Sequence, residues 1–498
     1  MKRVVVVGGG ISGLSTAFFL KERCGDLNEP VDIRLIEKDG HLGGSIVTDR
    51  VDGFLIEGGP DCFLSEKPWA LRLCEGLGLG DQLLNTNENR RTFILSEGRL
   101  HALPEGFMLL VPTSLMPFIR SSLISPLGKI RMAMDWVIPK RETDSEESLA
   151  EFVRRRLGTE ALEKIAEPLV AGIHASVPET MSLRATFPRF IELEEQYGSL
   201  IRGMLARRKV FAQFMKDRKG PVRTMFVTMK DGMGVLIETL RGRLAPGSIL
   251  LGKSVIALER EGGREGPSYR IGVSGGERLV ADAVVLAAPS FVSGELLAGL
   301  DKPLRDLLDT IPYVSSAIVH LAYRTSEIHD PLDGFGFVVP RSENRSIMAS
   351  TWTSVKFAHR APEGHVLLRV FIGGAKNEAA LDLDDAEMVA VSRKEMREIM
   401  GIEADPLFSR VYRWEKSMPQ YRIGHLDRVA QIRERVSMHP GIFLTGCAYR
   451  GVGISDCIHE GELTAEKVLE YLRRGLFLEK TGVRNQNTER GTPSGLTP

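Results

Sequence analysis

The sequence contains few cysteines, and they stand apart from one another. None of the five forms a C-x-x-C pair; they are Cys24, Cys62, Cys74, Cys447 and Cys457. An odd number without paired spacing argues against a disulfide framework and against a zinc site. This usage fits a reducing compartment, so we expect a cytoplasmic protein without a metal site.

A surplus of charge and a long apolar run are also missing. Lys+Arg and Asp+Glu both number 65, which gives a formal net charge of +0. Because binding to nucleic acid phosphates needs surplus cations, nucleic acid is not an expected partner. No stretch of about 18 uninterrupted apolar residues occurs, and the first predicted strand leaves no room for a cleavable signal. With 43% hydrophobic residues in 498, the chain is typical of a globular protein with two or more domains.

A glycine motif follows the first hydrophobic stretch. Residues 4–7 are all valine, which predicts a strand buried on both faces. Gly8, Gly10 and Gly13 then fit G-x-G-x-x-G at the start of a helical run. In a dinucleotide site the first glycine allows a tight turn, the second lets the backbone approach a pyrophosphate, and the third lets helix pack on strand. Glu37 ends the next predicted strand, where an acid accepts hydrogen bonds from ribose hydroxyls.

Further glycine segments indicate which dinucleotide binds. GGS at 43–45 and EGGPD at 57–61 follow closely, and near the other end a predicted strand at 441–446 leads through 451–453 into a helix. Segments from both ends that meet on one cofactor favour the long FAD molecule over NAD, and the acid beside the ribose disfavours NADP. No second G-x-G-x-x-G is present, so we expect no nicotinamide domain. The electrons would then leave to oxygen, a quinone or a partner protein.

These patterns predict an α/β protein whose cofactor domain is built from discontinuous segments. Residues 282–289 form a predicted buried strand that should lie beside the first strand. The predicted division is FAD-binding segments 1–87, 223–290 and 416–474, a mostly helical insertion 88–222, a substrate-binding α+β domain 291–415 and a polar, disordered tail 475–498.

The segment 104–139 is rich in apolar residues, is broken by Pro112, Pro117 and Pro126, and carries three basic side chains. Two interpretations stay open. One is an apolar surface that lies on a membrane or accepts a greasy substrate. The other is a set of short helices that pack on a core, with methionine as gap filler.

Taken together, the motifs resemble a known family. They are VVVVGGGISGL, EKDGHLGG, IEGGPDCFL, LHALPEG, ESLAEFVRRRLG, ATFPRF, VVLAAP, RWEKSMPQY and TGCAYRGVGISDCIHEG. The set resembles the FAD-containing protoporphyrinogen/coproporphyrinogen III oxidases of haem biosynthesis, of the soluble bacterial type, within the flavin amine oxidase superfamily. The resemblance covers about residues 3–472. It implies a glutathione-reductase-like (Rossmann-type) FAD domain, a substrate domain with a mixed sheet, and a helical insertion at which membrane contact is expected.

The resemblance also implies a reaction, the six-electron oxidation of coproporphyrinogen III or protoporphyrinogen IX. A hydride passes from a meso carbon to flavin N5, and in each of three cycles oxygen takes the electrons and becomes hydrogen peroxide. The protein supplies position and a dry apolar cavity to a non-covalent FAD. The resemblance implies two partners: a haem-pathway ferrochelatase that receives the porphyrin, and the inner face of the membrane, which the protein contacts peripherally.

Carried over position by position, the resemblance assigns the FAD contacts. They are Gly8, Gly10, Ile11, Ser12, Gly13, Glu37, Lys38, Gly44, Ser45, Gly59, Pro60, Asp61, Cys62, Val255, Trp414, Val452, Gly453 and Ile454. Lys67 matches a basic residue near the substrate in the soluble bacterial enzymes. The substrate-anchoring arginine of some members aligns with Thr92, and Arg90 and Arg91 adjoin it, so Arg91 is the second substrate-binding candidate. We assign no catalytic acid or base, because pyrrole protons can leave by tautomerism and water.

Two other functions stay open. Another flavin oxidase, of amine oxidase or phytoene-desaturase type, shares the glycine motifs, but an amine oxidase should carry an aromatic cage, for which only Trp414 and Tyr449 are at hand. A flavoprotein that binds tetrapyrrole without turnover would have lost residues around the flavin, whereas every expected glycine is present. Cys447 lies in the flavin-facing segment, where a covalent flavin link competes with a plain buried thiol.

Overall fold

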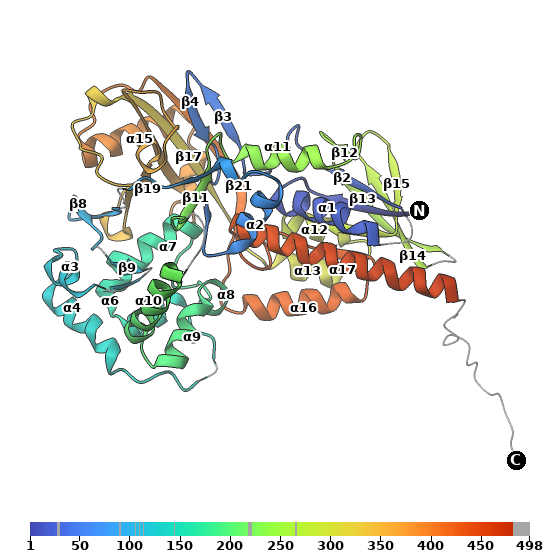
Figure 1. The fold of residues 1–498 in the computed structure, drawn as a ribbon, viewed down its shortest axis with the longest axis horizontal. Coiled ribbons are helices and arrows are strands. Elements are labelled where there is room, and N and C mark those ends of the chain that lie inside the picture. Colours follow the sequence, from blue (N-terminus) through green and yellow to red (C-terminus); the bar gives the residue numbers. More distant parts are fainter. Residues whose placement is uncertain are drawn as a thin grey trace, which may run out of the picture.

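The computed structural model describes residues 1–26, 30–88, 91–104, 106–108, 110–112, 114–143, 145–217, 222–263 and 266–481. A parallel sheet with its helices forms one end of the molecule, and a large mixed sheet with a helical region forms the other (Figure 1). Among the described residues, no helix is both long and apolar enough to cross a membrane.

A five-stranded parallel sheet organises the first lobe. Its order is β12-β2-β1-β16-β22, and its strands are β1 Lys2–Val7, β2 Val31–Ile36, β12 Ile249–Leu250, β16 Ala283–Leu286 and β22 Ile442–Leu444. Val4 pairs with Ile33 on one side and with Ala283 on the other, so the predicted strand at 282–289 does lie beside the first strand. Segments from the start, middle and end of the chain therefore build one sheet, as the sequence predicts.

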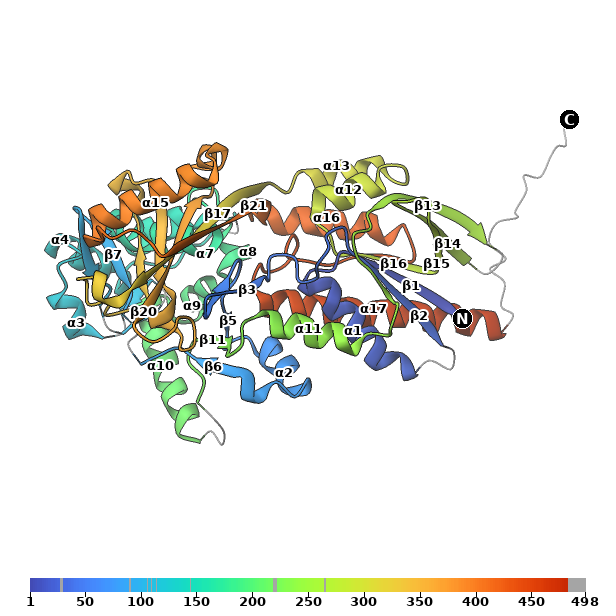
Figure 2. The same cartoon turned by 90° about the horizontal axis from the view of Figure 1, so that it is seen from above.

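Helices cover both faces of this sheet (Figure 2). On one face lie α1 Ile11–Arg23, α2 Pro68–Gly76, α11 Gly234–Arg243 and the long α17 Ile454–Thr481. On the other lie α12 Ser290–Leu297, α13 Lys302–Asp309, α16 His425–Ser437 and a three-stranded antiparallel sheet, β13 Val255–Gly263, β14 Gly266–Val273 and β15 Arg278–Ala281. Val4 and Val6 enter the core of the first face, and Val5 and Val7 that of the second. The valine run is buried on both faces because helices or strands cover each of them.

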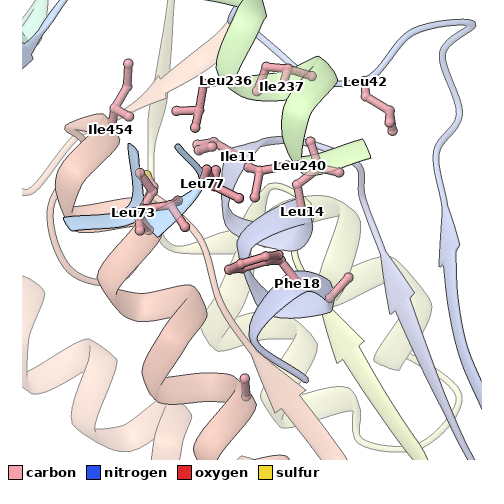
Figure 3. Close-up of a cluster of buried hydrophobic side chains, with 14 of the residues drawn as sticks. Ile11, Leu14, Phe18, Leu42, Leu73, Leu77, Leu236, Ile237, Leu240 and Ile454 are labelled. Atoms are coloured by element: carbon pink, nitrogen blue, oxygen red, sulfur yellow. The ribbon is translucent and has the colours of Figure 1, made fainter. Parts of the chain in front are cut away.

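The core between these helices lies directly behind the first glycine motif. Figure 3 shows Ile11, Leu14 and Phe18 of α1 in contact with residues of α2, of α11 and of the start of α17. The partners labelled there are Leu42, Leu73, Leu77, Leu236, Ile237, Leu240 and Ile454. This packing fixes the N-terminus of α1 against the sheet.

A seven-stranded sheet organises the second lobe. Its order is β21-β17-β20-β19-β18-β7-β8, made of β7 Phe93–Ser96, β8 Arg99–Ala102, β17 Tyr313–Arg324, β18 Gly336–Val338, β19 Ile347–Trp352, β20 His365–Gly373 and β21 Phe408–Pro419. Helices α14 Thr353–Lys356 and α15 Asp385–Met400 accompany it. All neighbours are antiparallel except β18 and β7, so the sheet is mixed. Strands β7 and β8 lie in this sheet, although the division above groups their residues with the helical insertion.

The rest of the insertion is helical around its own core. It contains α3 Leu115–Arg120, α4 Pro126–Ala133, α5 Leu149–Arg156, α6 Thr159–Ala161, α7 Glu167–His174, α8 Leu183–Thr186, α9 Pro188–Tyr197 and α10 Leu200–Asp217.

The smaller sheets are β3 Thr48–Val51 with β4 Phe54–Glu57, β5 Phe63–Leu64 with β11 Phe226–Met229 and β6 Leu83–Asn85, and β9 Phe107–Met108 with β10 Val111–Pro112. The last FAD-binding segment is predicted to end at residue 474, but its final helix, α17, continues to Thr481; the part of the predicted tail from residue 482 onward lies outside the described residues.

Candidate functional site

The first glycine motif forms the turn between β1 and α1. Gly8 adopts a φ of +108°, and its N–H donates to the Ile36 carbonyl at 2.8 Å. A Cβ at Gly13 would lie 1.9 Å from the Gly8 carbonyl oxygen, so only glycine lets α1 sit this close to the strand. The structure therefore shows the tight turn and the close helix–strand packing that the motif predicts.

Gly10 stands at the open side of this turn. Its φ is −65°, and a Cβ built on it meets no atom within 4 Å. It is the N-cap of α1, and among the described residues no side chain caps this helix and no acid occupies its first turn. The first-turn N–H groups are therefore available, and the helix dipole favours an anion there. This position fits the pyrophosphate of a dinucleotide.

Glu37 is buried beside the same turn, at the carboxyl end of β2. Its Oε2 accepts from the Gly9 N–H at 2.5 Å and its Oε1 from the Asp39 N–H at 2.9 Å. Each carboxylate oxygen keeps a lone pair with which it can accept a ribose hydroxyl. Lys38, next in the chain, is exposed. Glu37 is thus held in the orientation that a nucleotide contact requires.

The second and third glycine segments continue from Gly10. Gly10 and Gly43 form an isolated β-bridge, and a Cβ at Gly44 would lie 3.4 Å from the Gly10 Cα. A Cβ at Gly59 would lie 1.7 Å from the Ser45 carbonyl oxygen. The three segments are therefore packed backbone to backbone, in a row that starts at the N-terminus of α1.

The C-terminal segment reaches the same region. A Cβ at Gly461 would lie 2.8 Å from the Ser12 carbonyl oxygen, so α17 crosses α1 at close range near its first turn. Residues 452–454 lead into the N-terminus of α17, and both views show α17 running beside α1 (Figures 1 and 2). The two ends of the chain converge at α1 as predicted.

Trp414 and Val255 approach these loops from other elements. Trp414, on β21, donates its indole N–H to the Gly58 carbonyl at 2.8 Å. Val255 opens β13, two residues after Lys253, whose N–H donates to the Glu37 carbonyl at 2.9 Å. The structure therefore brings both residues next to the segments with which the resemblance groups them.

The two predicted substrate-binding cations are both paired. The Lys67 ammonium lies 2.6 Å from Asp456, in the first turn of α17, and its side chain is 42% exposed. Arg91 is exposed and forms an ion pair with Asp333. Arg90 lies outside the described residues. Contact of Lys67 or Arg91 with substrate stays a prediction.

A group of buried charges lies beside the EGGPD loop, and sequence reasoning missed most of it. Asp61 Oδ2 is 3.0 Å from the Lys356 ammonium, and Asp61 Oδ1 is 3.6 Å from Arg369 Nη1. Arg369 also donates to the Gly59 carbonyl, and the Cys62 thiol donates to Asp61 Oδ1 at 3.1 Å. Asp61, Lys356 and Arg369 are all less than 10% exposed. Lys356 and Arg369 come from α14 and β20, and no local motif marks either residue.

Burial and charge act in opposite directions on these groups. Burial alone would raise the pKa of Asp61, but Lys356 and Arg369 outweigh it and hold that pKa well below its usual range. Burial would lower the pKa of Lys356, but Asp61 reverses the shift and raises it. Burial, helped by Asp61, raises the pKa of the Cys62 thiol to about 12. The cluster therefore contains one carboxylate, two cations and a neutral thiol.

Cys447 is the thiol for which a covalent flavin link was considered. Burial raises its pKa to about 11, and its carbonyl accepts from the Tyr421 hydroxyl. A protonated thiol is a weak nucleophile. Within the described ranges, no group of three or more His, Cys, Asp or Glu side chains is arranged to hold a metal ion.

Comparison with known proteins shows to which family the chain belongs. The model of the flavin-containing amine oxidoreductase family matches residues 11–469. Coproporphyrinogen III oxidase of Bacillus subtilis (strain 168) is 36% identical over 474 residues, which cover 95% of this chain and 98% of that protein. Coproporphyrinogen III oxidase of Staphylococcus aureus is 34% identical, with coverage of 95% and 100%.

Solved structures agree with this placement. A crystal structure from Exiguobacterium sp. 255-15, named provisionally as a protoporphyrinogen oxidase, has a TM-score of 0.82 at 33% identity and covers 94% of this chain and 99% of that one. Putrescine oxidase shares the fold with a TM-score of 0.66 at 15% identity, with coverage of 94% and 99%. The chain therefore belongs to the flavin-containing amine oxidoreductase family, and within it to the branch that contains these porphyrinogen oxidases.

Proposed function

We propose that this protein is an FAD-dependent oxidase that converts a porphyrinogen to a porphyrin in haem biosynthesis, with coproporphyrinogen III or protoporphyrinogen IX as substrate. The FAD is bound without a covalent link, and oxygen accepts the electrons. The names of the relatives support the substrate class, because two coproporphyrinogen III oxidases match nearly the whole chain.

The observation that carries the proposal is the row of backbone contacts from Glu37 through Gly10 and Ser45 to Gly59. Glu37 suits the ribose and the N-terminus of α1 suits the pyrophosphate. The row then reaches Trp414, which donates to the Gly58 carbonyl, and Asp61, which follows Gly59 by two residues. An extended dinucleotide such as FAD has the length to follow it, with its adenosine half at Glu37 and its flavin half at the EGGPD loop.

The chemistry needs little from acid or base side chains. A bound flavin supplies the acceptor for a hydride from the meso carbon of the macrocycle. The protein residues hold and orient the reacting groups: Gly59 and Trp414 fix the loop, while Asp61 is fully paired with Lys356 and Arg369. Burial lowers the pKa of His320 to about 3, with Arg369 acting in the same direction, so this nearby histidine is neutral at physiological pH. Its Nε2–H donates to the Glu57 carbonyl at 3.1 Å, so it serves as a structural donor and not as a general acid.

Purification and a substrate panel test the proposal. The protein should be yellow, and chromatography of the flavin released by acid should yield FAD with none left on the polypeptide. Coproporphyrinogen III, protoporphyrinogen IX and putrescine are then each added under air, with porphyrin fluorescence, oxygen uptake and peroxide as readouts. A colourless protein that takes up no FAD, or one that oxidises only the amine, contradicts the proposal. The ratio of the two porphyrinogen rates identifies the physiological substrate.

We also propose that the segment 115–137 contacts an anionic membrane surface. Its inner side is core, since Phe118, Leu123, Ile124 and Met132 are buried, so this part of the packing interpretation is confirmed. The same segment also exposes large apolar side chains: Met116, Ile119, Leu127, Ile130, Met134, Trp136 and Val137, with Leu127 79% exposed. Arg120, between Ile119 and Leu127 in the sequence, and Lys140, which follows the segment, are both exposed and would contact lipid phosphates. Helices α3 and α4 lie at the end of the molecule away from the parallel sheet in both views (Figures 1 and 2).

Vesicle sedimentation tests this proposal. The protein should sediment with phosphatidylglycerol vesicles and less with phosphatidylcholine vesicles, and the double variant Leu127→Asp/Ile130→Asp should lose binding. Ile256→Asp is the matched control, because Ile256 is 66% exposed on β13, in the other lobe. Equal sedimentation of the double variant and the control contradicts the proposal. Hand-over of the porphyrin to ferrochelatase and a cytoplasmic location stay predictions.

A further inference from the structure

The buried charges beside the EGGPD loop do not cancel. Lys356 and Arg369 each contribute one positive charge and Asp61 one negative charge, which leaves +1. Cys62 and His320 are neutral, for the reasons given above. Glu57, which accepts from the Met233 N–H and the Thr48 hydroxyl, and Arg360, which donates to backbone carbonyls, lie outside this three-residue cluster. Burial raises the pKa of Glu57, although these donors and Arg360 act in the opposite direction.

The surplus charge is held in place from several directions. The Lys356 ammonium lies 5.1 Å from the centre of the Phe226 ring and 4.9 Å from that of Phe357, and the Arg369 guanidinium lies 4.6 Å from that of Phe371. These are cation–π distances, and the rings also exclude water. A fixed charge in a site with little water acts over a longer range than a hydrated one.

We infer that Lys356 and Arg369 are positioning residues that together hold one surplus positive charge beside the electron-accepting ring of the flavin. Asp61 holds both cations in place, and its negative charge reduces their summed charge from +2 to +1. The inference rests on the proposed function, because it uses the placement of the flavin half at the EGGPD loop. Each hydride carries two electrons and one proton out of the porphyrinogen, which also releases one proton to water. The flavin ring would thereby gain one negative charge, and a positive charge nearby would make this gain more favourable.

Sulfite binding measures this effect without turnover. Sulfite adds its sulfur lone pair to N5 of oxidised flavin, which bleaches the yellow absorbance and moves one negative charge into the ring. Lys356→Met lowers the net charge of the cluster from +1 to zero, so the sulfite dissociation constant should rise about tenfold. At an effective dielectric constant of about 20, a tenfold change is roughly the effect of one unit charge at about 12 Å. Asp61→Asn raises the charge to +2, so the same constant should fall by a similar factor.

Two further variants separate charge from packing. The double variant Asp61→Asn/Lys356→Met restores a net +1 and should return the sulfite constant to within about threefold of the unmodified protein. Lys356→Arg keeps the charge and should do the same. The control is Asp301→Asn, which breaks a buried ion pair with Arg435 in the other lobe and should leave sulfite binding unchanged.

The signs of the shifts decide the matter. A purely structural role would make Lys356→Met and Asp61→Asn shift sulfite binding in the same direction, and that result, or no shift in either, overturns the inference. If Lys356→Met fails to retain flavin, Asp61→Asn and the double variant still carry the test, because only the charge account predicts tighter sulfite binding and its reversal. A protein that binds no flavin even without substitution refutes the proposed function instead.

Discussion

The two halves of the candidate cofactor site are built in different ways. At the nucleotide half, around Gly8–Gly13 and Glu37, the chain presents backbone N–H groups, a helix end and one carboxylate within about 30 consecutive residues. At the other half, Asp61 meets Lys356 and Arg369, which follow it by about 300 residues in the sequence. The first half relies on steric fit of the backbone, and the second on charges brought together by the seven-stranded sheet.

The difference predicts different sensitivities. A site made of backbone contacts should respond to added atoms and be nearly indifferent to pH, because no group in it needs to change its protonation. A site made of buried charges should respond to pH and to charge substitution.

The largest effect is expected for Gly13→Ala. Its Cβ would lie 1.9 Å from the Gly8 carbonyl oxygen, which forces α1 off the sheet. We expect loss of FAD together with a fall of more than about 4 kcal/mol in the free energy of unfolding, the range of severe core strain. Flavin content and thermal unfolding of the apoprotein measure the two losses. Normal flavin content would show that the third glycine is not needed for packing.

Gly10→Ala is the matched change with a smaller effect. Its Cβ meets no protein atom and its φ of −65° suits alanine, so the apoprotein should unfold at an unchanged temperature. The added methyl would occupy the space of the pyrophosphate, so the dissociation constant for FAD should rise about tenfold or more, equivalent to about 1.4 kcal/mol. Fluorescence titration of the apoprotein with FAD gives this constant. Unchanged affinity would mean that the pyrophosphate lies elsewhere.

His320 makes the stability of the second half of the site, around Asp61 and Glu57, depend on pH. Because its folded pKa is about 3, below the ordinary value of about 6.5, the unfolded chain binds its proton first as pH falls. Its contribution is complete above pH 6.5 and is lost progressively toward pH 3, by about 1.4 kcal/mol per pH unit. His320→Gln can still donate to the Glu57 carbonyl. It should reduce the slope of unfolding free energy against pH by about 1.4 kcal/mol per pH unit, the contribution of one proton. Denaturant unfolding of both proteins at pH 7, 6 and 5 measures the slope; equal slopes would show that folding leaves the pKa of His320 unchanged.

The smallest change in stability is expected for Lys67→Met. Its ion pair with Asp456 is partly exposed and is worth no more than about 1 kcal/mol. If Lys67 binds a substrate propionate, KM for the porphyrinogen should rise several-fold with flavin content unchanged. Arg91→Met is the comparison, because Arg91 is exposed and paired with Asp333. Steady-state kinetics on both variants decide which cation contacts substrate; an unchanged KM in both would show that neither residue binds it.

Sequence reasoning worked where a structure depends on neighbours in the chain. The buried valine strand and the turn at Gly8 follow from local sterics and hydrophobic period, and the structure has both. The place of β7 and β8 in the seven-stranded sheet was not predicted, because pairing with β18 joins residues far apart in the chain. The last FAD-binding segment was predicted to end at residue 474, but α17 continues through Gly475 to Thr481.

For the site, the amino-acid order alone determined the nucleotide half, because a glycine without a side chain and an acid at a strand end define that geometry within one βαβ unit. Only the tertiary structure decided the ring half. Burying Asp61 requires compensating positive charge. Lys67, nearby in the chain, pairs with Asp456 instead, so α14 and β20 supply that charge once the two lobes have packed together.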